Sequence, residues 1–194
     1  MKYEIVFMER QILSIGLVER ELYQLYSNLS EKVEDLAAKS LFSYIATDSL
    51  KHSTILVTII EEAGGSKVKE QDCDPTISYN IDLIKTLSKE VPKRQIIDRE
   101  ELISLIDTLV NFEILLYDEY SKAFCLETTR LMETERNKTE ESDLNIFNLI
   151  INDETLHKRI LSSIVNSCDK KLDFRNNAPI VKYQRPDSWY IPPR

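Results

Sequence analysis

Apolar residues recur at spacings of three and four along most of this 194-residue chain, which is the pattern of helices that bury one face. The first such stretch runs from about Glu9 to Ala38. The second follows Ser40, a candidate N-cap, and is predicted to stop at Gly64 and Gly65, because glycine readily adopts the positive φ that closes a helix. The first third of the chain therefore predicts two long amphipathic helices.

The second half of the chain repeats this pattern. Asp98 is a candidate N-cap, and Glu101 three residues later completes the signature of a capping box. The third helix is predicted to continue from there to the polar run 136–142. A fourth helix is predicted from about Asp143 to Ser167, again with an apolar stripe.

The lengths of the connections indicate how these helices are arranged. The joins within each pair are short, which forces antiparallel neighbours, whereas a long crossover at about 64–97 separates the pairs and contains a short amphipathic piece at 81–87. Such a crossover lets the third helix start at the same end as the second. We therefore predict an all-α, antiparallel four-helix bundle over residues 1–168, built from two helical hairpins joined by the crossover.

The C-terminal segment 169–194 differs from the rest. Four prolines exclude a continuous helix, yet the segment is rich in aromatic and β-branched residues, which a disordered tail usually lacks. We expect an extended strap that docks on the bundle or on a second subunit, and we expect a homodimer.

Charge and composition narrow the classes of function. The chain has 25 Lys and Arg against 33 Asp and Glu, a formal charge of −8, so neither a nucleic acid nor an anionic membrane surface is an expected partner. No apolar run approaches the roughly 20 residues of a membrane span, and the start does not resemble a signal peptide. Cys73, Cys125 and Cys168 form no CxxC pair. We expect a cytoplasmic protein with reduced thiols, of which Cys125 and Cys168 are small buried hydrophobes.

Two carboxylates occupy positions where a helix should bury apolar residues. Stepping by three, four and seven from Glu113 meets only apolar residues and tyrosines, and Glu19 on the first helix has the same surroundings. A buried carboxylate costs several kcal/mol unless it is paired or binds a metal. Two such positions call for a common explanation.

The other two helices supply candidate partners. Glu154 and His157 form an i, i+3 pair on the fourth helix, and His52 lies on the second; the chain has only these two histidines. Superposing the two halves of the chain aligns Glu19 with Glu113, Tyr26 with Tyr120, Asp48 with Asp153, and His52 with His157. We interpret the tyrosines Tyr23, Tyr26, Tyr117 and Tyr120 as core packing rather than as redox relays.

Over about residues 9–167 this pattern resembles the ferritin-like superfamily, and most closely its rubrerythrin-like branch. Members hold two iron or manganese ions with one Glu from each of two helices and a Glu-x-x-His pair from each of the others. The resemblance implies an Fe or Mn site, with Zn as a possibility. It implies that the metal ligands are Glu19, His52, Glu113, Glu154 and His157.

Ser49 departs from that pattern, because it stands where the resemblance implies the second bridging glutamate. Serine is a poor ligand for iron or manganese, so affinity for the second metal should fall most. Asp48 could substitute if the helix shifted, although pairing with surface cations is the simpler expectation for Asp48 and for Asp153.

Three functions fit these observations. The first is an oxidoreductase that reduces peroxide or O₂ at a di-metal site, with electrons from an external donor because the chain has no CxxC iron site of its own. The second is a ferritin-like bundle with a degenerate site, acting as a non-enzymatic structural or interaction protein. The third is a mononuclear site built from Glu113, Glu154, His157 and Glu19.

Overall fold

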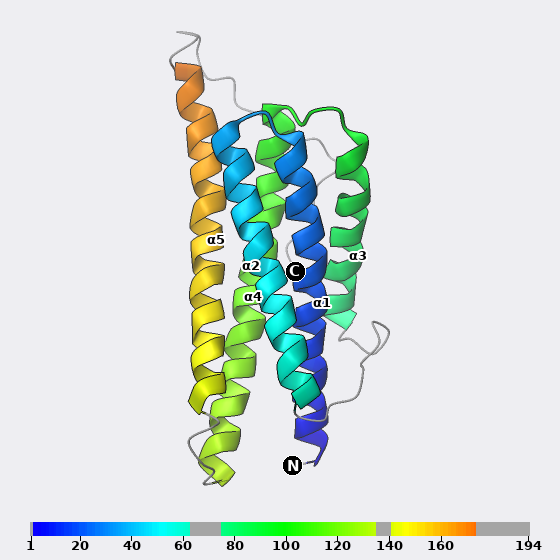
Figure 1. The fold of residues 1–194 in the computed structure, drawn as a ribbon, viewed down its shortest axis with the longest axis vertical. Helices are drawn as coiled ribbons and strands as arrows, with labels where there is room; N and C mark the ends of the chain where they lie inside the picture. The colour runs from blue at the N-terminus through cyan, green and yellow to red at the C-terminus, as the bar shows by residue number, and fades with distance from the viewer. Residues whose placement is uncertain (1, 63–74, 135–140, 174–194) are drawn as a thin grey trace.

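The computed structural model describes residues 2–62, 75–134 and 141–173, and these are almost entirely helical (Figure 1). The elements are α1 (Lys2–Lys32), α2 (Leu36–Glu62), α3 (Pro75–Glu90), the short 3₁₀ helix η2 (Val91–Lys93), α4 (Arg99–Thr134) and α5 (Glu141–Asp173). No strand occurs among the described residues. The all-α prediction is therefore confirmed for this part of the chain.

The helices lie roughly along one long axis and group into two pairs (Figure 1). α1 packs most extensively on α2, and α4 on α5, while α3 lies against α1. In the view of Figure 1, α1 rises, α2 descends, α3 rises beside α1, α4 descends and α5 rises, so α2 and α4 run in the same direction. This leaves the α1–α2 hairpin facing the α4–α5 hairpin.

The boundary between the first two helices differs from the prediction. α1 ends at Lys32 rather than near Ala38, and α2 already begins at Leu36. The Asp35 carboxylate accepts a hydrogen bond from the Ala38 amide at 3.0 Å, which is the geometry of an N-cap. Ser40 lies inside α2, where its hydroxyl donates to the Leu36 carbonyl. The prediction that Ser40 caps this helix was wrong, because Asp35 is an equally good cap and comes first.

The crossover contains more helix than the sequence pattern suggested. The amphipathic piece at 81–87 belongs to the 16-residue helix α3, which begins at Pro75, a residue well suited to a first helical position. Its stripe of Ile77, Ile81, Ile84 and Leu87 is buried, and Asn28 on α1 donates to the Ser88 carbonyl at 3.0 Å. α3 thus covers a side of α1 that would otherwise expose apolar residues.

The remaining boundaries agree better with the sequence pattern. The Asp98 carboxylate accepts a hydrogen bond from the Glu101 amide at 2.9 Å, so the predicted cap of α4 is confirmed. α5 continues to Asp173, six residues beyond the predicted end at Ser167. The glycines at 64 and 65 lie outside the described residues. The predicted extended strap began at residue 169, which was wrong for residues 169–173, because these continue the helix α5; the rest of the strap, 174–194, lies outside the described residues.

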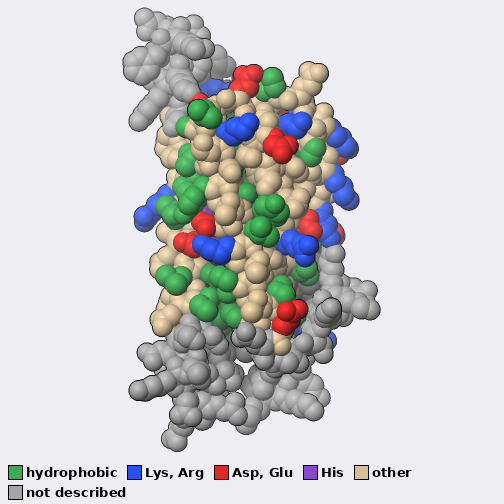
Figure 2. Space-filling model, viewed as in Figure 1, with side chains coloured by type: hydrophobic (Ala, Val, Ile, Leu, Met, Phe, Trp, Pro, Cys, Tyr) green, Lys and Arg blue, Asp and Glu red, His purple; other side chains and the backbone are tan. Residues whose placement is uncertain are grey.

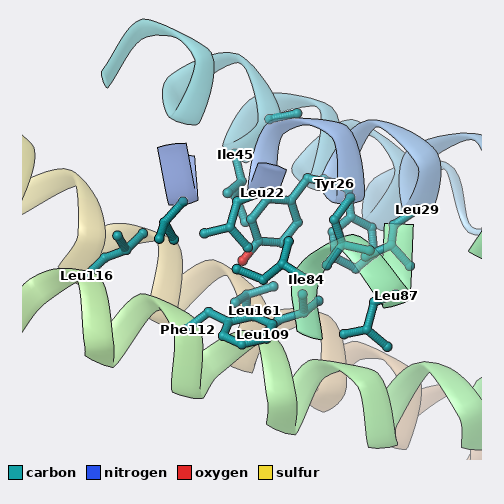
Figure 3. Packing of buried hydrophobic residues seen from close by; sticks show 14 of the residues in the cluster. Leu22, Tyr26, Leu29, Ile45, Ile84, Leu87, Leu109, Phe112, Leu116 and Leu161 are labelled. Atoms are coloured by element: carbon teal, nitrogen blue, oxygen red, sulfur yellow. The ribbon is translucent and has the colours of Figure 1, made fainter. Parts of the chain in front are cut away.

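The core joins all five helices (Figure 3). Apolar side chains from each helix meet in it, among them Leu22 from α1, Ile45 from α2, Ile84 from α3, Phe112 from α4 and Leu161 from α5. On the face drawn in Figure 2, acidic, basic and apolar side chains are interspersed. No helix in the described part of the chain is both long enough and apolar enough to cross a membrane.

Candidate metal centre

Five polar side chains meet in the interior of the bundle, and they are the five that the sequence singled out. Glu19 comes from α1, His52 from α2, Glu113 from α4, and Glu154 and His157 from α5; none has measurable solvent exposure. They form two groups whose candidate ligand atoms lie within 4.8 Å of one another. One group is Glu19, His52 and Glu154, and the other is Glu113, Glu154 and His157, so Glu154 belongs to both.

The inner nitrogen of each histidine faces the carboxylates. His52 Nδ1 lies 3.1 Å from Glu19 Oε1, and His157 Nδ1 lies 3.1 Å from Glu113 Oε2. Glu154 stands between the rings, with Oε1 at 3.2 Å from His52 Nδ1 and Oε2 at 3.7 Å from His157 Nδ1. The two imidazoles are 6.0 Å apart between centroids. Each Nδ1 is therefore placed to act as a ligand to a cation held among these carboxylates.

The outer nitrogen of each histidine contacts an aspartate from the opposite hairpin. His52 Nε2 is 3.1 Å from Asp153 Oδ2, and His157 Nε2 is 3.4 Å from Asp48 Oδ2. Lys51 joins these aspartates, with Nζ at 2.7 Å from Asp48 Oδ1 and 3.2 Å from Asp153 Oδ2. Histidine ligands commonly donate their other ring N–H to a carboxylate, which fixes the ring and its tautomer. Asp48 and Asp153 pair with a cation as expected, and they also orient the histidines.

Two tyrosines hold the single glutamates from across the bundle. Tyr120 on α4 donates its hydroxyl to Glu19 Oε1 at 2.7 Å, and Tyr26 on α1 donates to Glu113 Oε1. Both tyrosines are fully buried. The interpretation of these two as core packing was incomplete, because their hydroxyls are part of the polar centre. Tyr23 packs against the core, and the Tyr117 ring lies under Lys158 Nζ at 4.3 Å.

The centre has an approximate two-fold relation between the hairpins. Each of the two glutamates contacts a tyrosine of the other hairpin and the histidine of its own, and each histidine Nε2 contacts an aspartate of the other hairpin; Glu19 makes both of its contacts through Oε1, whereas Glu113 uses Oε1 for Tyr26 and Oε2 for His157. One position breaks the relation. Glu154 of α5 corresponds to Ser49 of α2, which is 1% exposed and lies on the stripe that also carries Ile45 and His52. Because Ser49 is buried, its position belongs to the interior of the bundle, as the pattern predicted.

Glu154 is the carboxyl group with least hydrogen bonding. Neither of its oxygens has a hydrogen bond of good geometry; Oε1 lies 3.2 Å from His52 Nδ1 as an ion-pair contact, and Glu19 Oε2 also lacks a well-formed hydrogen bond. Burial raises the pKa of Glu154 well above the usual range, and the neighbouring carboxylates of Glu19 and Glu113 raise it further. Orphaned buried carboxylate oxygens cost free energy in a purely structural core and are what a cation site requires.

The histidines carry the compensating charge in the metal-free protein. Burial lowers the pKa of His52, but its contacts with Glu154 and Glu19 outweigh burial and raise it to about 10. The pKa of His157 is likewise raised, because Glu113 outweighs burial. Burial also raises the pKa of Glu113, yet His157, Glu154 and Tyr26 outweigh it, so this carboxyl has a lowered pKa. A bound cation would take the place of the imidazolium protons.

Sequence reasoning missed part of the centre and misplaced one cysteine. Tyr26, Tyr120 and Lys51 were not predicted to belong to the centre, although each contacts a residue of the opposite hairpin. The alignment of Tyr26 with Tyr120 between the two halves of the chain was the signal that could have identified the tyrosines. Cys125 is exposed, so the prediction that it is buried was wrong. The side chains of Cys73 and Cys168 lie outside the described ones.

The chain was compared with known proteins in three ways. No family model, no curated protein and no solved structure matches it.

Proposed function

We propose that this protein is a ferritin-like metalloprotein that holds iron or manganese between two antiparallel helical hairpins. The proposed ligands are Glu19, His52, Glu113, Glu154 and His157. The observation that carries the proposal is Glu154, which is fully buried between two histidine Nδ1 atoms and has no hydrogen bond of good geometry to either oxygen. A core that had evolved for packing alone would pair or replace such a group.

The donor set fits this class of metal. Three carboxyl groups and two imidazoles suit Fe(II) or Mn(II), and zinc also accepts these ligands, whereas a structural zinc site or an iron–sulfur cluster would use thiolates. The only cysteine with a described side chain, Cys125, is exposed and outside the centre. The two groups of three ligands share Glu154, as a bridging carboxylate would.

The activity we propose is reduction of peroxide or O₂, with electrons from an external electron donor. A bound iron or manganese centre would supply the redox chemistry. The chain's own residues prepare the site: Asp153 and Asp48 hold His52 and His157 by Nε2, so that each Nδ1 faces the centre. Tyr26 and Tyr120 fix one oxygen of each terminal glutamate, and the surrounding apolar side chains exclude bulk water.

Anaerobic titration with Fe(II) tests this proposal. Wild-type protein should bind metal with a stoichiometry between one and two per chain, with the weaker position lined by α2, where Ser49 offers a hydroxyl in place of a carboxylate. Ser49→Glu should restore the second metal and speed oxidation by peroxide. If the wild type binds two ions tightly, Asp48 or another residue replaces the missing ligand. A wild type that binds one ion, with no gain in Ser49→Glu, would indicate the mononuclear site.

The second candidate function is a non-enzymatic bundle with a relic of the site. Ser49 favours it, because a serine has replaced one carboxylate while the rest of the hydrogen-bonded centre is intact. Under this alternative neither wild type nor Ser49→Glu binds metal, and the five inward residues form a polar core. A cytoplasmic location, a homodimer and an external electron donor stay predictions.

A further inference from the structure

Apolar side chains are exposed along the seam between α2 and α5, on the outer side of the polar centre. The seam is lined by two stripes, each spaced by four and then three residues: Tyr44, Asp48 and Lys51 on α2, and Leu149, Asp153 and Leu156 on α5. Lys51 contacts Asp153 of the other helix, so the two stripes face each other. Leu149 is 64% exposed, Tyr44 45% and Leu156 38%. Figure 2 shows apolar side chains beside acidic and basic ones over these two helices.

This row of apolar residues differs from a random scatter over the surface. Six of the ten large apolar side chains that are exposed among the described residues belong to α2 or α5. Single exposed apolar residues are common on any protein, whereas a contiguous row beside charged groups is typical of a docking surface. The row is only two side chains wide, which is too narrow for the roughly 800 Å² that each partner of a stable protein–protein interface buries. A segment of chain is therefore the occupant that fits it.

The residues that follow α5 are long enough to be that occupant. α5 continues to Asp173, and Asp153 lies twenty residues back along the helix, a distance of about 30 Å at 1.5 Å per residue. A chain that leaves Asp173 and returns along the seam needs about nine residues to cover this distance, since an extended chain advances about 3.3 Å per residue. Lys182 is the ninth residue of the segment 174–194. Twelve further residues then remain to cover the apolar side chains.

The composition of segment 174–194 also matches the seam. The segment holds four of the 25 basic residues of the chain and one of the 33 acidic ones, so residues 1–173 carry 21 basic against 32 acidic side chains. A basic segment is attracted to this acidic body. Its large apolar residues are Phe174, Ile180, Val181, Tyr183, Trp189, Tyr190 and Ile191. These side chains would bury both themselves and the exposed residues of the seam, which favours docking.

We propose that segment 174–194 docks along the α2–α5 seam of its own chain, with Lys182 beside Asp153 and the aromatic residues on the exposed apolar side chains. The docked segment covers Lys51 and Asp153, the outermost groups of the polar centre, and shields from bulk water the ion pairs that orient the histidines. This inference does not depend on a bound metal. It is tested on the metal-free protein, so its failure leaves the proposed function untouched.

Trp189 is the only tryptophan of the chain, so its fluorescence reports on the segment directly. In the wild type we expect Trp189 to be shielded from acrylamide, compared with the same protein in denaturant. Leu149→Glu should shift the balance from docked to free about tenfold, on the scale of one apolar side chain withheld from burial, and adding Leu156→Glu should shift it about tenfold again. In the double variant the emission should move to longer wavelength, and the quenching constant should rise toward that of the denatured chain.

The matched control is Tyr79→Glu on α3, which introduces the same charge at a residue that is 62% exposed and lies away from the seam. It should leave the quenching of Trp189 as in the wild type. Circular dichroism of each variant should show unchanged helix content, because the substituted side chains are exposed.

Cross-linking with an amine-reactive reagent locates the segment, because Lys182 is its only lysine. We expect links from Lys182 to Lys51 rather than to Lys93 on η2 or Lys122 on α4, whose side chains are more exposed than that of Lys51. In a mixture of unlabelled and ¹⁵N-labelled protein, the masses of the linked peptides show whether both residues belong to one chain. We expect links within single chains.

Shielding of Trp189 that is lost in the seam variants alone, together with the Lys51–Lys182 link within single chains, supports the inference. Trp189 as accessible in the wild type as in denaturant overturns it. Shielding that persists in the double variant, or a loss equal in Tyr79→Glu, overturns the seam as the docking place. Links between labelled and unlabelled chains show that the segment binds a second copy, and they overturn docking within one chain.

Discussion

The two hairpins of this protein are alike in their supports and unlike in their ligands. In both, a glutamate is held by the tyrosine of the other hairpin, and a histidine is held by an aspartate of the other hairpin. The α4–α5 hairpin adds Glu154, whereas the α1–α2 hairpin has Ser49 at the matching place. On the outer side, Lys51 of α2 contacts both aspartates, and the matching position of α5 is the partly exposed Leu156.

This comparison shows that the orienting groups agree between the hairpins while the ligands do not. In both hairpins the aspartates and tyrosines hold the histidines and glutamates in place, as the groups around metal ligands commonly do. Here the orienting groups are complete and one ligand is altered. The difference is concentrated at one buried position, Ser49 of α2.

The largest effect is expected from replacing Glu154, the carboxyl group that has no counterpart in the other hairpin. Glu154→Gln should lower affinity for both metal positions at least about a hundredfold, because Glu154 belongs to both ligand groups. The same change should raise the free energy of unfolding of the metal-free protein at neutral pH, because it removes a buried acid whose pKa is raised, and such a group costs stability at a pH where the unfolded chain ionises it. Calorimetric metal titration and chemical denaturation measure the two quantities.

The control for Glu154→Gln is Glu119→Gln, which removes a carboxylate from α4 away from the centre, where it pairs with Lys122. Its metal affinity should stay within about twofold of wild type. If Glu154→Gln weakens metal binding and at the same time stabilises the metal-free protein, Glu154 acts as a metal ligand. A loss of stability in metal-free Glu154→Gln would instead indicate that Glu154 has a structural role. The α4–α5 hairpin would then not differ from the α1–α2 hairpin by an additional ligand.

The next effect concerns the pH dependence of the metal-free protein. The pKa of His52 rises from its ordinary 6.5 to about 10 in the folded protein, so the folded state retains a proton that the unfolded chain releases. The stabilisation is complete below about pH 6.5 and is lost as the pH rises through 10. The unfolding temperature should therefore fall across this window, by about 2–4 °C for each kcal/mol lost.

Differential scanning calorimetry of wild type and His52→Gln checks this pH dependence. The variant should show a shallower decline over the same window, because the contribution of His52 would be absent while that of His157 stays. Metal affinity should change in the opposite sense and increase with pH, since bound metal displaces the imidazolium protons. A metal-free wild type whose stability rises between neutral and alkaline pH would contradict the charge assignment in both hairpins.

A smaller effect is expected at the two tyrosines, and it tests whether the supports are equivalent. Tyr26→Phe frees an oxygen of Glu113, and Tyr120→Phe frees an oxygen of Glu19. Each should lower the free energy of unfolding by about 1–3 kcal/mol, because a buried carboxylate loses a donor. Equal losses in denaturant titrations would support the two-fold relation, with Tyr23→Phe as the control. Unequal losses would show that the hairpins differ in their supports too.

The smallest effect is expected at Lys51, on the outer side of the centre. Lys51→Met leaves Asp48 and Asp153 without their common cation, so the histidines are held less firmly and metal affinity should fall by up to about tenfold. Lys51→Arg should restore most of the affinity. Lys122→Met, at a comparable surface ion pair, should leave it unchanged. Metal titration that shows the same loss in Lys51→Met and Lys122→Met would assign the effect to net charge.

The sequence predicted the inward residues because a helix has one dominant period. Glu19 and Glu113 stand among apolar residues at that spacing, and no tertiary information was needed to place them inside. The Asp98 cap was predictable for a similar reason, since its partner is local. Ser40 failed because two cap candidates, Asp35 and Ser40, lie within one stretch, and propensity does not rank them.

Helical periodicity cannot predict which residues of different helices contact each other. The bonds Tyr120–Glu19 and His157–Asp48 join residues about a hundred positions apart, and their geometry depends on how the hairpins face each other. The bridging of both aspartates by Lys51 depends on the same arrangement. The prediction for Cys125 was wrong because a cysteine near an apolar stripe resembles a core residue in the sequence. Its exposure depends on its angular position around α4, which places it on the solvent side.

The polar centre also determines how the two hairpins align along their length. Tyr26, Tyr120, His52, His157 and Lys51 each make a side-chain hydrogen bond between the hairpins within the centre, and Gln11–Glu119 adds one outside it. Apolar stripes of similar texture tolerate a slide of one helical turn, about 5.4 Å. Such a slide would separate each tyrosine from its glutamate and each histidine from its aspartate. The hydrogen bonds of the centre therefore favour one alignment of the two hairpins along the bundle axis over alignments shifted by a helical turn.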